Sequence, residues 1–172
     1  MKTQLALLTA VCAVMFCLSC GPDAFTLVRQ QEAAKLDRLL FDRPGQAKAR
    51  DEHRRTPLHL AVSQNDPRAV RILLEHGANM HARDELRATP VELALTSGEA
   101  DLVKPFLDHG LGVNTVLREN MRPLDIATSA AENGGVVRLL RRRGAKTNQE
   151  IHNDIYGTGR SEEHTLNSSH YS

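Results

Sequence analysis

A repeat of 33 residues constrains the fold more than any other feature of this chain. Pro57, Pro90 and Pro123 are spaced 33 residues apart, and each is the second residue of a related hexapeptide, TPLHLA, TPVELA or RPLDIA. A second related segment ends in glycine at positions 77, 110 and 144, so the last repeat carries one extra residue. Self-similarity at a fixed period of this length predicts a stack of similar supersecondary units.

Each repeat contains start and stop signals for two short helices. Thr56 and Thr89 can cap a helix while the following proline occupies its first position, where the missing N–H is no loss. Asp66 and Pro67 repeat this arrangement for a second helix, and Gly77 can take the left-handed conformation that ends it. One such unit cannot bury its apolar residues alone, so neighbouring units must pack together. The sequence therefore predicts an all-α fold of helix-turn-helix units with projecting turns.

The pattern resembles the ankyrin repeat, which has a 33-residue period and a T-P-L-H-x-A signature. The resemblance covers residues 24–149 and implies an ankyrin-repeat solenoid. Its expected parts are a partial N-terminal capping repeat at 24–50 and full repeats at 51–83, 84–116 and 117–149. Arg141 replaces the leucine found at this position in earlier repeats, which indicates a terminal repeat whose outer face meets water.

Two departures from the pattern affect the expected backbone. Pro105 falls inside a second helix, where it would cost ~3 kcal/mol if the helix stayed regular, so we expect a kink or a short 3₁₀ stretch. The turn before each hexapeptide usually has glycine in this family, whereas this chain has Arg54, Arg87 and Asn120. Because asparagine tolerates a positive φ better than arginine does, we expect the first two turns to differ in shape from the third.

The first 20 residues have the features of an export signal. Met1 and Lys2 precede an apolar run at 5–18 that is shorter than the ~20 residues of a transmembrane helix. The segment at 16–20, FCLSC, resembles a bacterial lipobox, although cysteine stands where the family prefers leucine. We therefore expect a signal peptide at 1–19, lipidation of Cys20 and a short tether at 20–23. Cleavage of the same bond by ordinary signal peptidase, or an uncleaved anchor, is the alternative.

Composition argues against several classes of function. All three cysteines lie at positions 12, 17 and 20, so the folded domain has neither a disulfide nor thiol chemistry. The net charge of +1 and the absence of tryptophan argue against nucleic-acid binding. The sequence contains no phosphate-binding glycine loop, H-E-x-x-H or G-x-S-x-G motif, so we predict no catalytic residue, no metal and no cofactor.

The histidines and arginines of the repeats have structural interpretations. His59 is expected to hydrogen-bond the Thr56 region or a neighbouring turn, as the family implies, instead of a metal. His76 and His109 precede the terminating glycines and can interact with the last carbonyls of a helix. The basic residues Arg138, Arg141, Arg142 and Arg143 also suit a helix C-terminus. Their alternative role is contact with an anionic partner such as lipid headgroups.

The family resemblance implies binding of a protein partner on a concave face, made of loop tips and the exposed side of each first helix. The residues expected there are Glu52, His53, Ser63, Gln64, Glu85, Leu86, Leu95, Thr96, Arg118 and Glu119. Leu86 is the most informative, because an apolar residue on a turn tip can anchor a partner. We therefore expect a monomeric, non-catalytic protein-binding module of the bacterial cell envelope, anchored to the membrane or soluble in the periplasm. The alternative is an envelope-structural or enzyme-accessory lipoprotein that acts as a spacer.

The C-terminal segment differs from the repeats. Residues 150–159 show no clear pattern and are interpreted as a linker or disordered segment. Residues 160–165, RSEEHT, are what the common sequencing adapter AGATCGGAAGAGCACAC encodes in frame. We interpret residues 160–172 as adapter read-through without function.

Overall fold

The computed structural model describes residues 21–130 and 134–156, and the chain divides into two compact units, Met1–Pro90 and Val91–Ser172. The described residues form helices and no strand, which confirms the all-α class and its helix-turn-helix units. No helix in these residues is long and apolar enough to span a membrane. The predictions for the signal peptide, Cys20 and the tail at 160–172 concern residues outside the described ranges.

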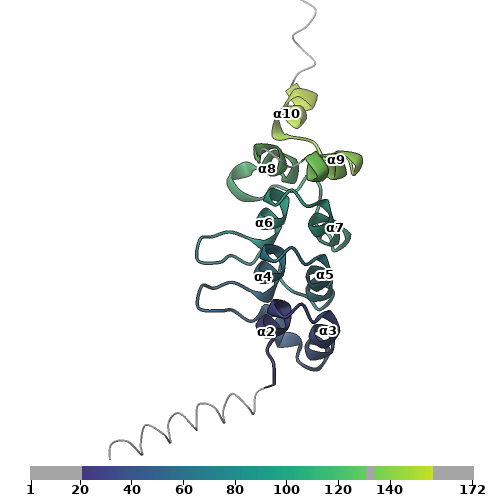
Figure 1. Ribbon diagram of the computed structural model, residues 1–172. Helices are drawn as coiled ribbons and strands as arrows, with labels where there is room; N and C mark the ends of the chain where they lie inside the picture. Colours follow the sequence, from purple (N-terminus) through teal and green to yellow (C-terminus); the bar gives the residue numbers. More distant parts are fainter. Residues whose placement is uncertain (1–20, 131–133, 157–172) are drawn as a thin grey trace, which may run out of the picture. The chain divides into compact units, whose positions relative to one another are not determined.

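Unit 1, Met1–Pro90, contains two helix pairs in its described part (Figure 1). Its helices are α2 (Ala24–Arg29), α3 (Ala33–Asp42), the 3₁₀ helix η1 (Pro44–Lys48), α4 (Pro57–Ser63) and α5 (Pro67–Glu75). Helix α2 packs on α4, and α3 packs on α5. Leu27, Leu36, Leu58 and Leu73 are almost or fully inaccessible to solvent, so the pairs bury apolar residues that neither pair could bury alone.

Unit 2, Val91–Ser172, repeats this arrangement. Its helices are α6 (Pro90–Thr96), which begins at the last residue of unit 1, α7 (Ala100–Asp108), the 3₁₀ helix η2 (Arg118–Asn120), α8 (Pro123–Ser129), α9 (Gly134–Arg142) and α10 (Asn148–Tyr156). Helix α9 packs on both α7 and α8. The core of unit 2 contains four fully buried side chains, Leu102, Phe106, Leu124 and Leu140.

Helix α7 corrects one of the two alternatives expected at Pro105, the 3₁₀ stretch, and does not test the other, a kink. Residues Ala100–Asp108 are α-helical throughout, so the 3₁₀ stretch expected at Pro105 does not form. Pro105 is buried beside Phe106 in the sequence, and burial of apolar surface offsets the lost hydrogen bond.

Helix α10 occupies most of the segment that was expected to be a linker. It begins with a reciprocal cap, in which the Thr147 N–H donates to the Glu150 carboxylate at 2.8 Å and the Glu150 N–H donates to the Thr147 hydroxyl at 3.2 Å. Arg141 donates two hydrogen bonds to the same carboxylate, at 2.6 and 2.7 Å. The side chain of Arg141 is therefore attached to a further helix and does not simply face water.

Candidate partner-binding surface

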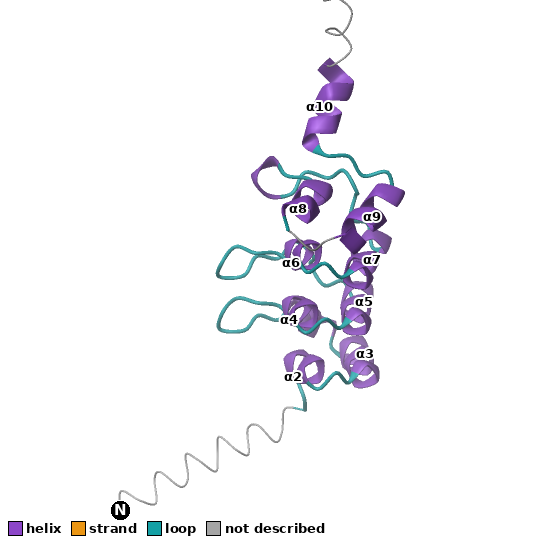
Figure 2. Cartoon of the chain, turned by 45° about the horizontal axis from the view of Figure 1, so that its top comes forward, coloured by secondary structure: helices purple, strands orange, loops and turns teal. Residues whose placement is uncertain are grey.

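Two hairpin loops project from the described part of unit 1, one leading into α4 and one leading into α6 (Figure 2). We name their ends fingertip 1, residues 51–55, and fingertip 2, residues 84–88. Each is closed by backbone hydrogen bonds: the Asp51 N–H donates to the Arg55 carbonyl at 3.0 Å, and the Asp84 N–H donates to the Ala88 carbonyl at 3.1 Å. The two tips thus have the same construction, as the repeat predicts.

An aspartate supports each fingertip from inside. The Asp51 carboxylate accepts hydrogen bonds from the N–H groups of His53 and Arg55, at 3.0 and 2.8 Å, and pairs with the Arg55 guanidinium at 2.8 Å. Burial raises the pKa of Asp51, but the hydrogen bonds and charge of Arg55 outweigh burial and hold this pKa below its ordinary value. The Asp84 carboxylate accepts from the Ala88 N–H at 2.8 Å. Both loops are therefore stiffened by local side-chain hydrogen bonds.

The two fingertips are also bonded to each other. The Glu85 N–H donates to the His53 carbonyl at 3.0 Å, and the His53 ring Nδ1 lies 3.2 Å from the Glu85 carboxylate. One nitrogen of the Arg50 guanidinium donates to the carbonyls of both Arg54 and Arg83, each at 2.8 Å. These bonds hold neighbouring tips in register, which lowers the entropy that the loops would lose on binding a partner.

The backbone of the three turns corrects the expectation that arginine would avoid the positive φ that asparagine tolerates. Arg54, Arg87 and Asn120 have nearly identical φ values of 60°, 61° and 61°. The left-handed conformation costs arginine ~1–2 kcal/mol, and the aspartate hydrogen bonds of fingertips 1 and 2 over-determine it. The turn in unit 2 does differ in shape from the other two, as expected, since it forms the 3₁₀ helix η2; it has Leu117 where they have aspartate.

His59 connects α4 to fingertip 2. Its Nδ1 accepts a hydrogen bond from the Thr56 N–H at 3.0 Å, so its Nε2 carries the proton and donates to the Ala88 carbonyl at 3.2 Å. The side chain is almost completely buried, and burial lowers its pKa below the ordinary histidine value. The predicted hydrogen bonding of His59 to the Thr56 region and a neighbouring turn is confirmed.

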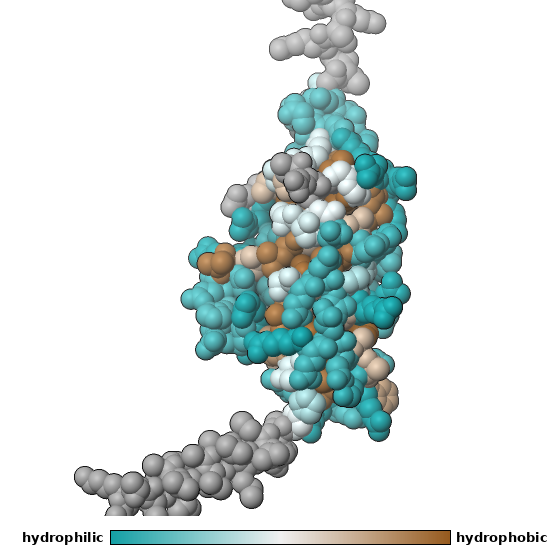
Figure 3. Space-filling view, in the orientation of Figure 1, coloured by the Kyte–Doolittle hydropathy of each residue, from teal (hydrophilic) through white to brown (hydrophobic). Residues whose placement is uncertain are grey.

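Four of the predicted partner-binding residues come together at the fingertips. Glu52, His53, Glu85 and Leu86 are all exposed. Leu86 has 83% of its surface exposed, the highest value among the large apolar side chains of the described residues. In Figure 3 the projecting end of the loop that leads into α6 carries an apolar spot surrounded by hydrophilic surface. The fingertips thus present one apolar group on a rigid polar support.

The residues predicted at the end of α4 are less available. Ser63 is exposed, but its hydroxyl donates to the Leu60 carbonyl of its own helix at 2.8 Å. Gln64 is half-buried, and its amide oxygen has no hydrogen-bond partner among the residues that the structure describes. The oxygen is itself shielded from solvent, so it is not exposed to a partner.

The prediction that Leu95 binds a partner is wrong. Leu95 is fully buried in the core of unit 2, whereas the next residue, Thr96, is exposed. The error is a slip of one position: the repeat aligns Ser63 with Thr96, and therefore Leu95 with the buried Val62. One residue along a helix rotates the side chain by about 100°, enough to move it from the surface to the core.

The remaining predicted residues lie in unit 2 or outside the described part. Arg118 is exposed in η2, with its Nε 3.9 Å from the Glu92 carboxylate. Glu119 lies in the same 3₁₀ helix, but its side chain is outside what the structure describes. Cys20 is also outside the described residues.

Two of the basic residues at the end of α9 are neutralised within unit 2. Arg141 pairs with Glu150, and Arg143 lies 3.4 Å from the Asp108 carboxylate. Arg138 is exposed on the same helix. The internal pairs reduce the positive charge that this segment offers to an anionic partner.

The two histidines before the terminating glycines differ. The His76 Nε2 lies 2.8 Å from the Asp37 carboxylate of α3, so this side chain joins the end of α5 to α3. We had expected it to interact with the last carbonyls of its own helix. His109 is exposed. The described residues contain no group of three or more histidine, cysteine, aspartate or glutamate side chains that could hold a metal ion.

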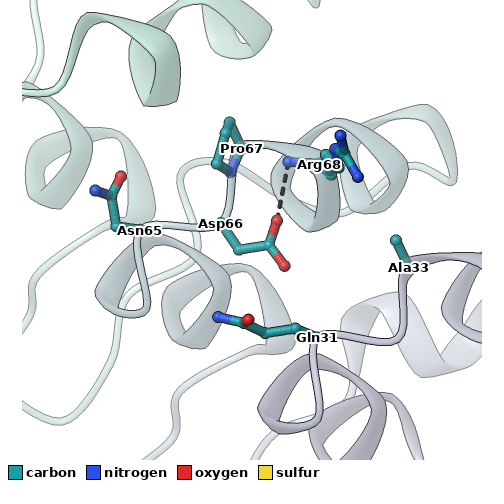
Figure 4. Close-up of a pocket in the computed structure, with 6 residues that line it drawn as sticks. All are labelled: Gln31, Ala33, Asn65, Asp66, Pro67 and Arg68. Atoms are coloured by element: carbon teal, nitrogen blue, oxygen red, sulfur yellow. Dashed lines mark hydrogen bonds between the residues drawn. The ribbon is translucent and has the colours of Figure 1, made fainter.

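A pocket of about 270 Å³ lies where the turn after α2 approaches the turn between α4 and α5 (Figure 4). It is lined by Gln31, Ala33, Asn65, Asp66, Pro67 and Arg68. The Asp66 carboxylate points towards the start of α5 and accepts from the N–H groups of Arg68 and Ala69, at 3.0 and 3.1 Å. The Asp66 carboxylate, which lines the pocket, therefore serves as the cap of α5.

The geometry agrees with the comparison with known families. Residues 38–94 match the family model for ankyrin repeats (many copies). The ankyrin match includes both fingertips, His59 and the helices α4 and α5. The curated proteins contain no match to this chain. Ankyrin repeats are general protein–protein interaction modules and are typically non-catalytic.

Proposed function

We propose that the chain is a non-catalytic binding module of the bacterial cell envelope. It holds one protein partner against its fingertips and the exposed side of the first helix of each repeat. The observation that carries this proposal is the exposed Leu86 on a hydrogen-bonded fingertip. Full burial of a leucine side chain contributes ~1.5–3 kcal/mol. A rigid support keeps most of that gain, because little loop entropy is lost on binding.

The polar surroundings of Leu86 support the same proposal. The energetically important residues of protein interfaces are few and central, and polar groups around them exclude water. Glu52, His53 and Glu85 lie on the same two fingertips as Leu86. We expect Leu86 to fill an apolar pocket of the partner, with the polar groups at the rim.

The envelope assignment rests on the N-terminal sequence. We propose that residues 1–19 are removed and that Cys20 becomes lipidated, which places the repeats close to a membrane through the tether at 20–23. A tether of this length reaches only ~10–14 Å. Partners would therefore be envelope proteins that lie at the same membrane surface.

Co-purification from envelope fractions tests the binding proposal. The test variant is Leu86→Asp, and the matched control is Phe41→Asp, because Phe41 is equally exposed, at 81%, on α3. We expect one protein to co-purify with the wild type and the control and to be lost with Leu86→Asp. An unchanged set of co-purifying proteins in all three would contradict the proposal and favour the spacer function.

A further inference from the structure

Arg54 and Arg87 occupy a backbone conformation that is unfavourable for arginine. Their φ values of 60° and 61° lie in the left-handed region, where the Cβ atom of an L-residue is crowded. Glycine adopts this region without that cost. The two arginines are 33 residues apart, at equivalent positions of adjacent repeats. Backbone strain at two equivalent positions indicates that the side chains have a use that offsets it.

Neither guanidinium has such a use inside the protein. Both residues are exposed, and neither side chain has a hydrogen bond or ion pair with any residue that the structure describes. Their neighbours differ: the Arg50 side chain donates to two carbonyls, and Arg55 pairs with Asp51 at 2.8 Å. The stability of the fingertips therefore does not explain Arg54 and Arg87.

The carboxylates of the fingertips do not neutralise them. Asp51 pairs with Arg55, Asp84 accepts from a backbone N–H at 2.8 Å, and Glu85 lies 3.2 Å from the His53 ring. Glu52 lies 3.7 Å from the other nitrogen of the same ring. The two positive charges thus remain available to an outside group, and one of them is adjacent in sequence to Leu86.

We propose that Arg54 and Arg87 bind carboxylates of an acidic segment of the protein partner, while Leu86 contacts an apolar side chain of that segment. A guanidinium binds a carboxylate through two parallel hydrogen bonds, and this geometry is stronger and more specific than contact with a lysine. Two such sites on adjacent, cross-bonded fingertips fit carboxylates that are spaced along one extended segment. This inference rests on the proposed function and names the chemical class of the partner.

Binding of a synthetic acidic peptide tests the inference. The probe is a fluorescein-labelled peptide with three copies of Glu-Glu-Leu-Ala, and its uncharged equivalent has Gln in place of Glu. The protein is the mature full chain, measured by fluorescence anisotropy at low salt and at about 0.15 M salt, because exposed charge pairs weaken as salt is added. We expect the acidic peptide to bind at least about tenfold more tightly than the uncharged one at low salt.

Two double variants identify the residues responsible. R54G/R87G removes both charges and relieves the backbone strain, so we expect about tenfold weaker peptide binding together with a higher urea midpoint. R54Q/R87Q removes the charges but keeps the strained backbone, so the same loss of binding in both excludes loop flexibility as its cause. The matched control is R38Q/R71Q, which removes the same charge from exposed positions on α3 and α5. The control should bind like the wild type.

Three results would overturn the inference: equal binding of the two peptides, unchanged binding by R54G/R87G, or an equal loss in R38Q/R71Q. Arginine-dependent binding to vesicles of anionic phospholipid, without peptide binding, would assign the same side chains to a lipid surface and overturn it as well. A partner that still depends on Leu86 while the acidic peptide does not bind would refute this inference alone. The proposed function would then stand.

Discussion

The replacement His59→Ala tests how the fingertips are attached to the helices. His59 accepts a hydrogen bond from the Thr56 N–H at 3.0 Å and donates one to the Ala88 carbonyl at 3.2 Å. Alanine at this position removes both bonds and the contact between Nδ1 and the Thr56 hydroxyl at 2.9 Å. The Ala88 carbonyl keeps its hydrogen bond from the Asp84 N–H, whereas the Thr56 N–H loses its partner. Thr56 is itself only 3% exposed, so water cannot replace the lost partner of its N–H without a local opening.

The expected loss follows from these contacts. An unsatisfied buried N–H costs ~1–3 kcal/mol, and the lost bond to Ala88 contributes ~1 kcal/mol more. We therefore expect His59→Ala to lower the free energy of unfolding by ~2–4 kcal/mol. His81→Ala is the matched control, because His81 is exposed and its side chain has no hydrogen bond within the described residues. The control should change the free energy by less than ~0.5 kcal/mol.

The loss should also depend on pH. Burial lowers the pKa of His59 in the folded state, whereas the unfolded chain has the ordinary value of 6.5. Protonation therefore favours unfolding. The stabilisation by neutral His59 is complete above pH 6.5 and is lost as the pH falls towards the lower folded-state pKa. The difference between the wild type and His59→Ala should thus shrink as the solution is made acidic.

Urea unfolding followed by circular dichroism measures this difference at about pH 8 and about pH 5. Hydrogen exchange of the α4 amides reports the same change locally, without assuming that the two units unfold together. A variant as stable as the wild type at the higher pH would refute the reasoning. So would a difference that grows on acidification.

Further predictions concern individual side chains and the C-terminal segment. Leu95→Asp should unfold unit 2, lowering the free energy of unfolding by at least ~4 kcal/mol, whereas Thr96→Asp should lower it by less than ~1 kcal/mol. Thermal melting measures both, and equal effects would contradict the burial of Leu95. The Thr147 N–H and then Arg141 lower the pKa of Glu150, so the attachment of α10 should be complete above pH 4.5 and lost as the pH falls below it. Glu150→Gln should raise hydrogen exchange in α10 at neutral pH, and unchanged exchange would count against the cap. Cys20→Ala should abolish incorporation of labelled palmitate, and persistent labelling would disprove lipidation there. Resequencing of the genome across codon 160 should show that the segment RSEEHT is not encoded there. Finding it in the genome would refute the read-through interpretation.

Much of the fold was predictable because helix ends are encoded locally. Thr56 with Pro57 and Asp66 with Pro67 begin α4 and α5 as expected, since the cap and the missing proline N–H act within one turn. The start of α10 was equally readable, because Thr147 and Glu150 have the spacing of a reciprocal cap. The helix itself was not expected, because the residues after this cap lack a clear apolar repeat.

The candidate site was only partly predictable. Exposure of Leu86 followed from its place on a turn between two related hexapeptides. The exposure predicted for Leu95 failed, because a hydrophobic residue near a helix end gives no local sign of which way it points, and only alignment with Val62 assigns it to the core. Arg54 and Arg87 stood out in the sequence because they replace the usual glycine, but the positive φ that the folded loop gives them was not expected.

The sequence by itself determined the repeat period, the starts of α4 and α5 and the all-α class, because these depend on interactions between residues a few positions apart. Tertiary structure decided which side chains face solvent and how the fingertips are held. The bonds from His59 to Ala88 and from Glu85 to His53 join neighbouring repeats, and no local pattern specifies their geometry. Long-range contacts of this kind can hold Arg54 and Arg87 in a conformation that their own backbone preferences oppose.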